Sequence, residues 1–365
     1  MSGSDARFMK AALALGRRGL GRTWPNPAVG CVIVQGSRVV GRGWTQPGGR
    51  PHAEVAALAQ AGALAKRATV YVTLEPCAHH GETAPCAEAL TAAQVARVVI
   101  AVEDPDARVS GRGIQMLKDA GISITIGVEK TAACQAHSGF FYRLLDNRPF
   151  VTLKMASSFD GRIATGSGQS QWITGPDARR VVHAMRARHD AVMVGGGTAR
   201  HDDPSLTVRG LGIDRQPQRV VLTRRLDLPL SGQLAKTAGE VGVILCHGRD
   251  ADPMLRKTWE DLGATLLECK TKGVQVDPAD ALGKLAELGL TRVFCEGGGA
   301  LAASLIEARL VDQLIGFTAG MSIGAEGLPG IGALGLGSLT DAQRFSLVRT
   351  QSIGADVMHV WDAKS

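Results

Sequence analysis

Hydrophobic and polar positions follow a strand-like and helix-like alternation along the first part of the chain. Some segments carry apolar residues at helical spacing, and others are short apolar runs bounded by Gly or polar residues. Helices are predicted at 5–18 (with Asp5 as its N-cap), 52–63, 86–94 and 111–121. Strands are predicted at 29–34, 38–44, 68–77, 97–102 and 123–128, and the first two form a hairpin around 35–37. This alternation predicts an α/β layered domain over residues 1–146.

A second alternating series follows a joint at residues 147–149, where polar residues cluster and Pro149 ends the preceding helix. Its predicted strands are 150–158, 191–197, 219–224, 241–246 and 292–299. At 365 residues the chain also exceeds the usual span of one hydrophobic core. We therefore expect a second α/β domain over residues 150–365.

The composition is that of an ordinary globular protein. Hydrophobic residues make up 45% and charged residues 21%, which excludes a disordered chain. The seven Cys are scattered and no leader-like apolar run precedes them, so we expect a reducing cytoplasm and no disulfide framework. The longest Gly-rich apolar stretch, 316–337, is interrupted by Glu326 and Pro329, so no membrane segment is expected. The net charge of +7 suits phosphorylated small ligands as well as nucleic acid.

One His, one Glu and two Cys of the first domain have the spacing of a zinc site. A catalytic zinc takes three protein ligands and leaves a fourth position for water. His52 and Cys86 each open a predicted helix, and Cys77 ends a predicted strand. A helix N-terminus favours negative charge, which should favour a thiolate at Cys86. Glu54, two residues after His52, is close enough to carry a proton without being a ligand.

A non-ligand Glu beside a zinc held by His and Cys is the arrangement of zinc nucleobase deaminases. Their simplest signature has two residues between the cysteines, whereas here the eight residues "AHHGETAP" intervene and could form a wall of the pocket. Two other interpretations stay open. His79 or His80 could complete a four-ligand structural site, or the Cys and His could be inert core residues.

In the second domain, a Gly run at 297–299 lies between a predicted strand and a predicted helix. Glycine in such a turn lets backbone N–H groups approach a pyrophosphate at the helix N-terminus. The run is not G-x-G-x-x-G, and a Gly-rich turn of this kind is often only structural.

The motifs together resemble one known family. "TWPNPAVGCVIV", "PHAEVAAL" and "TLEPCAHHGETAPC" are similar to the deaminase half of the bifunctional riboflavin-biosynthesis deaminase–reductases. The segments 153–180, 191–209 and 293–314 resemble the reductase half, in the same order. The resemblance implies an N-terminal cytidine-deaminase-like α/β/α layered domain and a C-terminal dihydrofolate-reductase-like α/β domain. It also implies one Zn²⁺ per chain in the first site and NADPH in the second.

The resemblance assigns roles to residues of this chain. In the deaminase it implies His52, Cys77 and Cys86 as zinc ligands, Glu54 as the proton shuttle, and Asn26, His79 and His80 on the substrate side, although an Asn-Pro turn alone would also explain Asn26. Glu82 stands where many members carry a basic residue. For the cofactor it implies Ala156, Trp172, Thr198, Asp202 and the phosphate turn Gly298, Gly299, Ala300, Leu301, Ala302, Ala303 and Ser304. Substrate contacts implied are Ser170, Arg186, Leu206, Arg209 and Glu296.

Four basic residues of the second domain have a physical rationale beside the resemblance. Arg186 and Arg209 suit a ribose 5-phosphate, because a guanidinium pairs with phosphate in bidentate fashion. Lys154 on the first strand is a candidate neighbour of the cofactor. Arg224 could pair with the 2′-phosphate of NADP.

We therefore expect a cytoplasmic, homo-oligomeric enzyme with two successive activities on a phosphorylated pyrimidine. Zinc-dependent hydrolytic deamination of 2,5-diamino-6-(5-phosphoribosylamino)pyrimidin-4-one comes first, and NADPH reduction then gives 5-amino-6-(5-phosphoribitylamino)uracil. Asp202 is a candidate for protonation in the second step. The alternatives are a nucleic-acid base deaminase with an appended binding domain and a non-catalytic scaffold stabilised by zinc.

Overall fold

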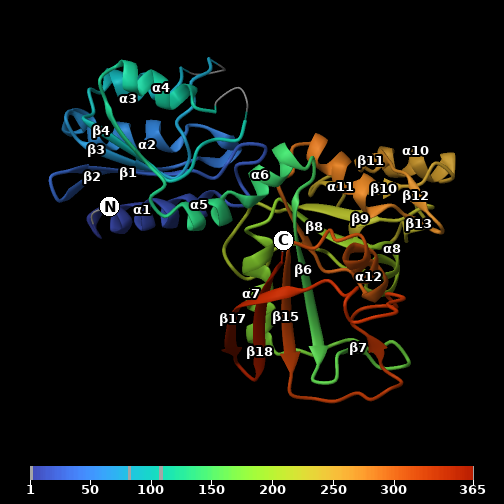
Figure 1. Cartoon of the computed structure of the whole chain (residues 1–365). Helices are drawn as coiled ribbons and strands as arrows, with labels where there is room; N and C mark the ends of the chain where they lie inside the picture. Colours follow the sequence, from blue (N-terminus) through green and yellow to red (C-terminus); the bar gives the residue numbers. More distant parts are fainter. Residues whose placement is uncertain (1–2, 81–83, 107–109, 365) are drawn as a thin grey trace. The chain divides into compact units, whose positions relative to one another are not determined.

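The chain forms two compact units, Met1–Asn147 and Arg148–Ser365 (Figure 1). The structure is a computed structural model that describes residues 3–80, 84–106 and 110–364. None of the helices in these ranges is both long and apolar enough to span a membrane.

The first unit is built on a five-stranded mixed sheet with strand order β2-β1-β3-β4-β5. The expected hairpin is confirmed: its strands pair antiparallel, and the turn uses Gly36 at a φ of 63°. The β1–β3 pair is also antiparallel, whereas β3, β4 and β5 run parallel. The strands are β1 (Gly30–Gln35), β2 (Arg38–Trp44), β3 (Thr69–Val72), β4 (Arg97–Ile100) and β5 (Ser123–Ile126).

Helices cover both faces of this sheet. Figure 1 shows α1 and α5 on one face and α2, α3 and α4 on the other. Aliphatic side chains from both layers and from the strands form a single buried cluster, which gives the expected α/β/α layering. The helices are α1 (Gly3–Gly16), α2 (Ala53–Ala61), α3 (Cys86–Ala92), α4 (Arg112–Asp119), α5 (Lys130–Ala136) and α6 (Ser138–Leu145).

Asp5 does not cap the first helix, and that expectation is wrong. The helix begins earlier, at Gly3, and Asp5 is buried inside it. Its carboxylate accepts hydrogen bonds from the Tyr71 hydroxyl at 2.8 Å and from the Arg97 guanidinium at 3.1 and 3.0 Å. A carboxylate near a helix start is favourable as a cap, but here an arginine and a tyrosine from the sheet bind it instead.

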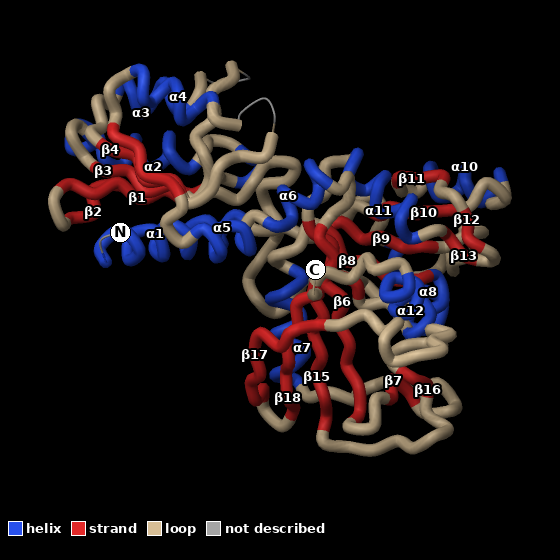
Figure 2. The backbone as a smooth tube through the Cα atoms, in the orientation of Figure 1, coloured by secondary structure: helices blue, strands red, loops and turns tan. Residues whose placement is uncertain are grey.

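The second unit contains a nine-stranded sheet with order β11-β10-β9-β8-β14-β6-β15-β18-β17. The strands from β11 to β15 are parallel, and the last two pairs are antiparallel. Two short pairs, β12–β13 and β16–β7, lie apart from it (Figure 2). The main strands are β6 (Phe150–Ser158), β8 (Ala191–Gly195), β9 (Gln218–Leu222), β10 (Val243–His247), β11 (Thr265–Glu268), β14 (Arg292–Cys295), β15 (Gln313–Ala319), β17 (Phe345–Ile353) and β18 (Asp356–Ala363); the short ones are β7 (Arg162–Ala164), β12 (Thr271–Lys272), β13 (Gln275–Val276) and β16 (Leu328–Pro329).

The helices of the second unit begin where the parallel strands end. The α8 helix follows β8 directly, and α12 follows β14 through the Gly run, so both helix N-termini lie at the carboxyl edge of the sheet. Ligands of open α/β sheets bind at this edge. The helices are α7 (Pro176–Arg186), α8 (Gly196–Asp202), α9 (Gln233–Lys236), α10 (Pro253–Asp261), α11 (Pro278–Glu287) and α12 (Gly299–Glu307).

Candidate functional sites in the two units

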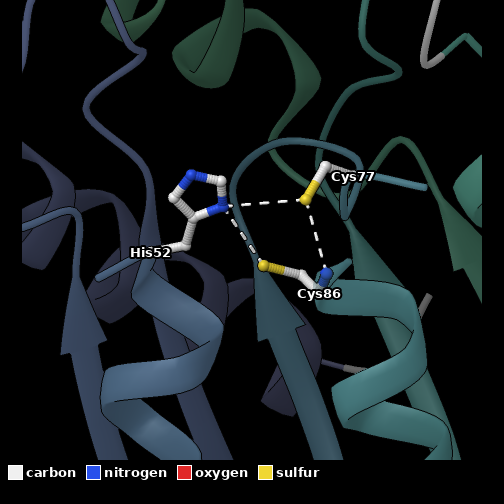
Figure 3. Close-up of side chains that lie close together, drawn as sticks. All are labelled: His52, Cys77 and Cys86. Atoms are coloured by element: carbon white, nitrogen blue, oxygen red, sulfur yellow. Dashed lines mark hydrogen bonds between the residues drawn. The ribbon is translucent and has the colours of Figure 1, made fainter. Parts of the chain in front are cut away.

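His52, Cys77 and Cys86 converge in the first unit (Figure 3). His52 is the extended residue immediately before α2, Cys77 follows the end of β3, and Cys86 is the first residue of α3. The His52 Nδ1 atom lies 3.3 Å from the Cys86 Sγ and 3.7 Å from the Cys77 Sγ. Three residues that are far apart in the sequence thus direct one nitrogen and two sulfurs to a common point.

The donor set and its spacing fit zinc. A tetrahedral zinc with bonds of about 2.1 Å to nitrogen and about 2.3 Å to sulfur separates such ligand atoms by about 3.6 Å. All three ligand atoms lie within 4.8 Å of one another, and no further His, Cys, Asp or Glu of the described ranges joins the group. His79 is exposed, and His80 pairs with Glu88 at 2.9 Å. The described residues therefore form a three-ligand site, which leaves a position for a reacting molecule, rather than a four-ligand structural one.

The helix N-terminus of α3 acts on Cys77 rather than on Cys86. The Cys86 backbone N–H donates a hydrogen bond of 3.3 Å to the Cys77 sulfur. Together with hydrogen bonds from the Cys86 thiol and from His52, this lowers the pKa of Cys77 to about 4. The shared proton and burial raise the pKa of Cys86. The first N–H of α3 therefore favours a thiolate at Cys77, and the thiolate expected at Cys86 stays a prediction.

Glu54 lies beside the ligands without being one of them. It is in the first turn of α2, 3% exposed, and its carboxylate forms a hydrogen bond with the Cys86 thiol. Burial raises the pKa of Glu54 to about 7, although the nearby His52 opposes the shift. A buried carboxyl with a pKa near neutrality can both accept and release a proton.

Two close backbone approaches hold this site together. A Cβ on Gly43 of β2 would lie 2.0 Å from the Ala53 carbonyl oxygen, so only glycine lets the start of α2 pack this tightly on the sheet. A Cβ on Gly113 would lie 1.9 Å from the Pro76 carbonyl oxygen, directly before Cys77. These glycines allow the helix starts to reach the ligands.

Glu75 is a residue of this site that the sequence analysis missed. Its buried carboxylate accepts four backbone N–H bonds of 3.1 to 3.3 Å, from Asp104, Gly111, Gly113 and Ile114. It therefore joins the chain two residues before Cys77 to the N-terminus of α4. Its position in "LEPC", two residues before Cys77, could have marked it as part of the site, but only the fold shows which backbone groups it binds.

Of the residues expected on the substrate side of the deaminase, Asn26 packs against the chain and His79 is exposed. Asn26 closes a turn with Thr23, and its amide lies against Gly49, three residues before His52. His79 is exposed beyond Cys77. Glu82 lies outside the described residues.

A cavity of about 1090 Å³ opens at the carboxyl edge of the second sheet. Ala302 faces the core instead and is fully buried. Arg224 is absent from the cavity wall, and its guanidinium pairs with Asp250 at 2.5 and 3.2 Å. The expected residues that do line the cavity are Lys154, Ala156, Ser170, Trp172, Arg186, Thr198, Asp202, Leu206, Arg209, Glu296, Gly298, Gly299, Ala300, Leu301, Ala303 and Ser304.

The start of α12 has the features of a phosphate-binding turn. Gly298 is its N-cap in extended conformation, and the Gly298 N–H donates to the Thr198 hydroxyl at 3.0 Å. A Cβ on Gly299 would lie 2.7 Å from the Pro329 carbonyl oxygen. The first turn has no acidic residue, so its N–H groups and the helix dipole favour an anion.

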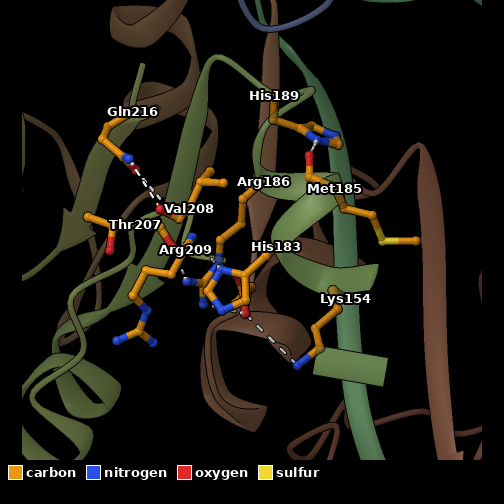
Figure 4. Close-up of polar contacts among 10 residues, drawn as sticks. Lys154, His183, Met185, Arg186, His189, Thr207, Val208, Arg209 and Gln216 are labelled. Atoms are coloured by element: carbon orange, nitrogen blue, oxygen red, sulfur yellow. Dashed lines mark hydrogen bonds and ion pairs between the residues drawn. The ribbon is translucent and has the colours of Figure 1, made fainter. Parts of the chain in front are cut away.

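A partly buried charge cluster forms another wall of the cavity. The Arg186 guanidinium pairs with Glu296 through Nε at 2.5 Å and Nη2 at 3.1 Å, and Lys154 Nζ lies 3.9 Å from the same carboxylate. Burial lowers the pKa of Lys154; for Glu296, the two cations outweigh burial and lower the pKa. Arg186 thus binds a carboxylate of its own chain, whereas Arg209 is exposed (Figure 4).

Each of the two units matches a known protein family. Residues 149–359 match the family described as the RibD C-terminal domain. Residues 2–102 match the family described as the cytidine and deoxycytidylate deaminase zinc-binding region. The expected fold, a deaminase-like domain followed by a dihydrofolate-reductase-like domain, is confirmed.

Relatives match over nearly the whole length. The riboflavin biosynthesis protein RibD of Escherichia coli is 39% identical over 359 residues, which cover 97% of this chain and 98% of the relative. The structure of Acinetobacter baumannii RibD (form 1) aligns with a TM-score of 0.89 at 38% identity, covering 99% of each chain. A Thermotoga maritima diaminohydroxyphosphoribosylaminopyrimidine deaminase/5-amino-6-(5-phosphoribosylamino)uracil reductase aligns with a TM-score of 0.86 at 32% identity, again over 99% of each chain.

Proposed function

The chain belongs to the RibD family of bifunctional riboflavin-biosynthesis enzymes, and on that premise we propose that it deaminates a diaminopyrimidinone carrying a phosphoribosylamino group and then reduces the resulting 5-amino-6-(5-phosphoribosylamino)uracil. It is a hydrolase and an oxidoreductase in one chain, acting on a small pyrimidine. The observation that carries the proposal is the three-ligand site with the buried, non-ligand Glu54 beside it. The second unit matches a reductase domain, which argues against an appended nucleic-acid-binding domain.

In the deaminase, the chain supplies the metal ligands and the proton carrier. His52, Cys77 and Cys86 would hold the zinc, which when bound supplies Lewis-acid activation of water. Glu54 takes a proton from the attacking water and delivers it to the amine, which departs as ammonia while the ring carbon becomes a carbonyl. Burial raises the pKa of Glu54, which favours the protonated form that the second of these steps requires.

In the reductase, the chain mainly binds and orients. NADPH when bound supplies the hydride that reduces C1 of the ribosyl chain. The N-terminus of α12 and Thr198 are suited to its pyrophosphate, and Ala156 and Trp172 line the same cavity. Arg186 and Lys154 keep Glu296 ionised, whereas burial raises the pKa of Asp202, the wall carboxyl that is our candidate for the proton donor.

A coupled assay tests the proposal. The zinc-loaded full chain is given the phosphorylated diaminopyrimidine, first alone and then with NADPH, and both ammonia and NADPH are followed. We expect ammonia release without NADPH, and NADPH oxidation only after deamination. Deamination of an oligonucleotide with no NADPH oxidation on the deaminated pyrimidine would instead identify a nucleic-acid base deaminase.

We also propose NADPH rather than NADH as the reductant. Arg224 and Arg225 follow β9, and Thr223 before them packs against Gly196, which is flanked by cavity-lining Gly195 and Gly197. A guanidinium here can pair with a ribose 2′-phosphate. Replacing Arg224 with Ala should raise the KM for NADPH about tenfold and leave that for NADH unchanged, as steady-state kinetics can measure. Equal changes for both nucleotides would contradict this assignment.

A homo-oligomeric assembly is proposed from the end of the second sheet. Strand β17 pairs only with β18 within the described chain, and it is exposed along both faces. Leu347 and Val348 on it are 53% and 55% exposed. An unpaired strand edge that carries two exposed apolar side chains can pair with another copy of the chain. The seven cysteines, all free, support the expected cytoplasmic location.

A further inference from the structure

Three side chains hold the short segment Thr207–Arg209 at the wall of the reductase cavity (Figure 4). The His183 Nδ1 atom accepts the Arg209 backbone N–H at 3.2 Å, and the Arg186 Nη1 donates to the Thr207 carbonyl oxygen at 2.7 Å. Gln216 binds both backbone groups of Val208, accepting its N–H at 2.6 Å and donating to its carbonyl at 3.2 Å. Side chains thus replace the backbone partners that a strand neighbour would provide.

The anchor of this segment is itself rigid. His183 and Arg186 are three residues apart on α7, so they project from the same face of the helix. Arg186 is further held by its two bonds to Glu296. Val208 is buried at 4% exposure. The position of the Arg209 backbone is therefore determined by elements that are already fixed in the fold.

The Arg209 backbone is held by other residues, but no residue of the described ranges holds the Arg209 side chain. It is exposed, it lines the cavity, and its guanidinium points away from the three anchoring side chains (Figure 4). Across the described residues, no hydrogen bond or ion pair joins that guanidinium to another side chain. By contrast, three N–H groups of the Arg186 guanidinium already donate hydrogen bonds to Glu296 and Thr207. Arg209 is thus the better placed of the two for an external phosphate.

We infer that His183 is a positioning residue of the reductase, which holds the Arg209 backbone and so presents the Arg209 guanidinium to the phosphate of the substrate. The inference rests on the proposed function of this site and adds a residue to it. Fixing the backbone before binding lowers the entropy that phosphate binding would otherwise cost. Without the His183 acceptor, the Arg209 N–H loses its partner and the segment is held at two residues instead of three.

The protonation state of His183 agrees with this role. Because Nδ1 accepts a hydrogen bond, the ring proton must be on Nε2 and the imidazole must be neutral. Burial and the neighbouring Arg186 and Arg209 lower the pKa of His183, while Glu296 and the Thr207 carbonyl act in the opposite direction. The neutral acceptor form is thus the one favoured at neutral pH.

Two nearly isosteric variants test the inference in the full, zinc-loaded chain. His183→Asn keeps an acceptor close to the Nδ1 position, and His183→Leu has similar size but no acceptor. Ribose 5-phosphate serves as a competitive probe of the reductase, and Arg209→Ala is the reference. We expect His183→Leu to raise the inhibition constant of the probe about five- to tenfold and His183→Asn to change it less than about twofold. The KM for NADPH should stay constant in both, which a general disruption of the site would not allow.

Hydrogen exchange provides a readout that does not depend on activity. Amides of the peptide covering residues 204–210 should exchange faster in His183→Leu than in His183→Asn. If Arg209→Ala weakens the probe but the two His183 variants behave alike in both measurements, the positioning role is overturned and the phosphate assignment survives. If Arg209→Ala leaves the probe unaffected, the phosphate assignment itself fails, and the role of His183 fails with it.

Discussion

At the scale of single residues, the deaminase depends on a carboxylate that touches the metal ligands without joining them. Glu54 contacts the Cys86 thiol and is nearly inaccessible to water, so its proton can pass only to groups inside the site. In our proposal the three ligands bind the metal, and Glu54 moves protons. These two tasks can be separated by mutation.

Replacing Glu54 with Gln should keep the zinc and abolish deamination. The amide has nearly the same size but cannot take a proton, so the deaminase kcat should fall by about 10²- to 10⁴-fold. Metal analysis should show an unchanged zinc content, while His52→Ala, which removes a ligand, should lose zinc. A Glu54→Gln enzyme with the wild-type rate would rule out the shuttle, and absence of deamination in the wild type would support the zinc-stabilised scaffold.

At the scale of secondary-structure elements, a buried histidine joins α7 to the strands beside it. His189 follows the helix; its Nδ1 bonds the Met185 carbonyl at 2.8 Å, and its Nε2 lies 3.1 Å from the Thr152 hydroxyl of β6. Burial lowers its pKa to about 3 from the ordinary 6.5. The imidazole is neutral in the folded unit, and protonation would leave a charge in the core.

This histidine should make the second unit less stable in acid. Since the folded pKa is depressed, the unfolded chain binds more protons between pH 6.5 and about 3, and the free energy of unfolding falls as pH is lowered through that window. Between pH 7 and pH 5 the loss due to His189 alone should be about 2 kcal/mol. Urea unfolding of the wild type and of His189→Gln at both pH values would measure it. An equal pH dependence in the two proteins would contradict the prediction.

At the scale of the whole molecule, the chain combines two chemically independent sites. The metal ligands all lie in the first unit, and the cavity residues all lie in the second. The two activities therefore need not share any residue. They should respond separately to loss of the metal.

Removing zinc with a chelator should stop the deaminase and spare the reductase. Ammonia release should fall to background, while NADPH oxidation on the already deaminated pyrimidine should stay within about twofold of its starting rate. Adding Zn²⁺ back should restore deamination. Parallel loss of both activities would show that the second site depends on the metal after all.

We expect the edge strand β17 of the nine-stranded sheet to form the interface between copies of the chain. Replacing Val348 on β17 with Lys adds a charge to the exposed apolar pair of this edge strand, so the oligomer should dissociate in analytical ultracentrifugation. Leu339→Lys is the matched control, because Leu339 is 83% exposed and lies outside the strand. A monomeric wild type, or an oligomer that survives Val348→Lys, would exclude this edge as the interface.

Much of the fold and of the metal site follows from the local pattern of residues. Strand 150–158 was predicted with the bounds of β6, and the alternating segments of the first unit correspond to β1–β5 and α1–α4, with β3 shorter than expected. The exposed strand β17, with its partner β18, and helix α5 were not predicted as elements, and the helix expected before Pro149, which is α6, was predicted without bounds. Hydrophobic periodicity reports burial on one face, and β17 buries neither face.

The sequence by itself determined the order of the two α/β units, and it identified the His and two Cys that converge in the first unit together with the neighbouring carboxylate. These features depend on residue type and on spacing to a helix start or strand end, which are local properties. Only the tertiary structure decided which side chains pair. Asp5 binds Arg97 rather than a helix end, and Arg186 binds Glu296, 110 residues away, which leaves Arg209 open to the cavity. Such partners come from distant segments, and no local pattern encodes the contact between them.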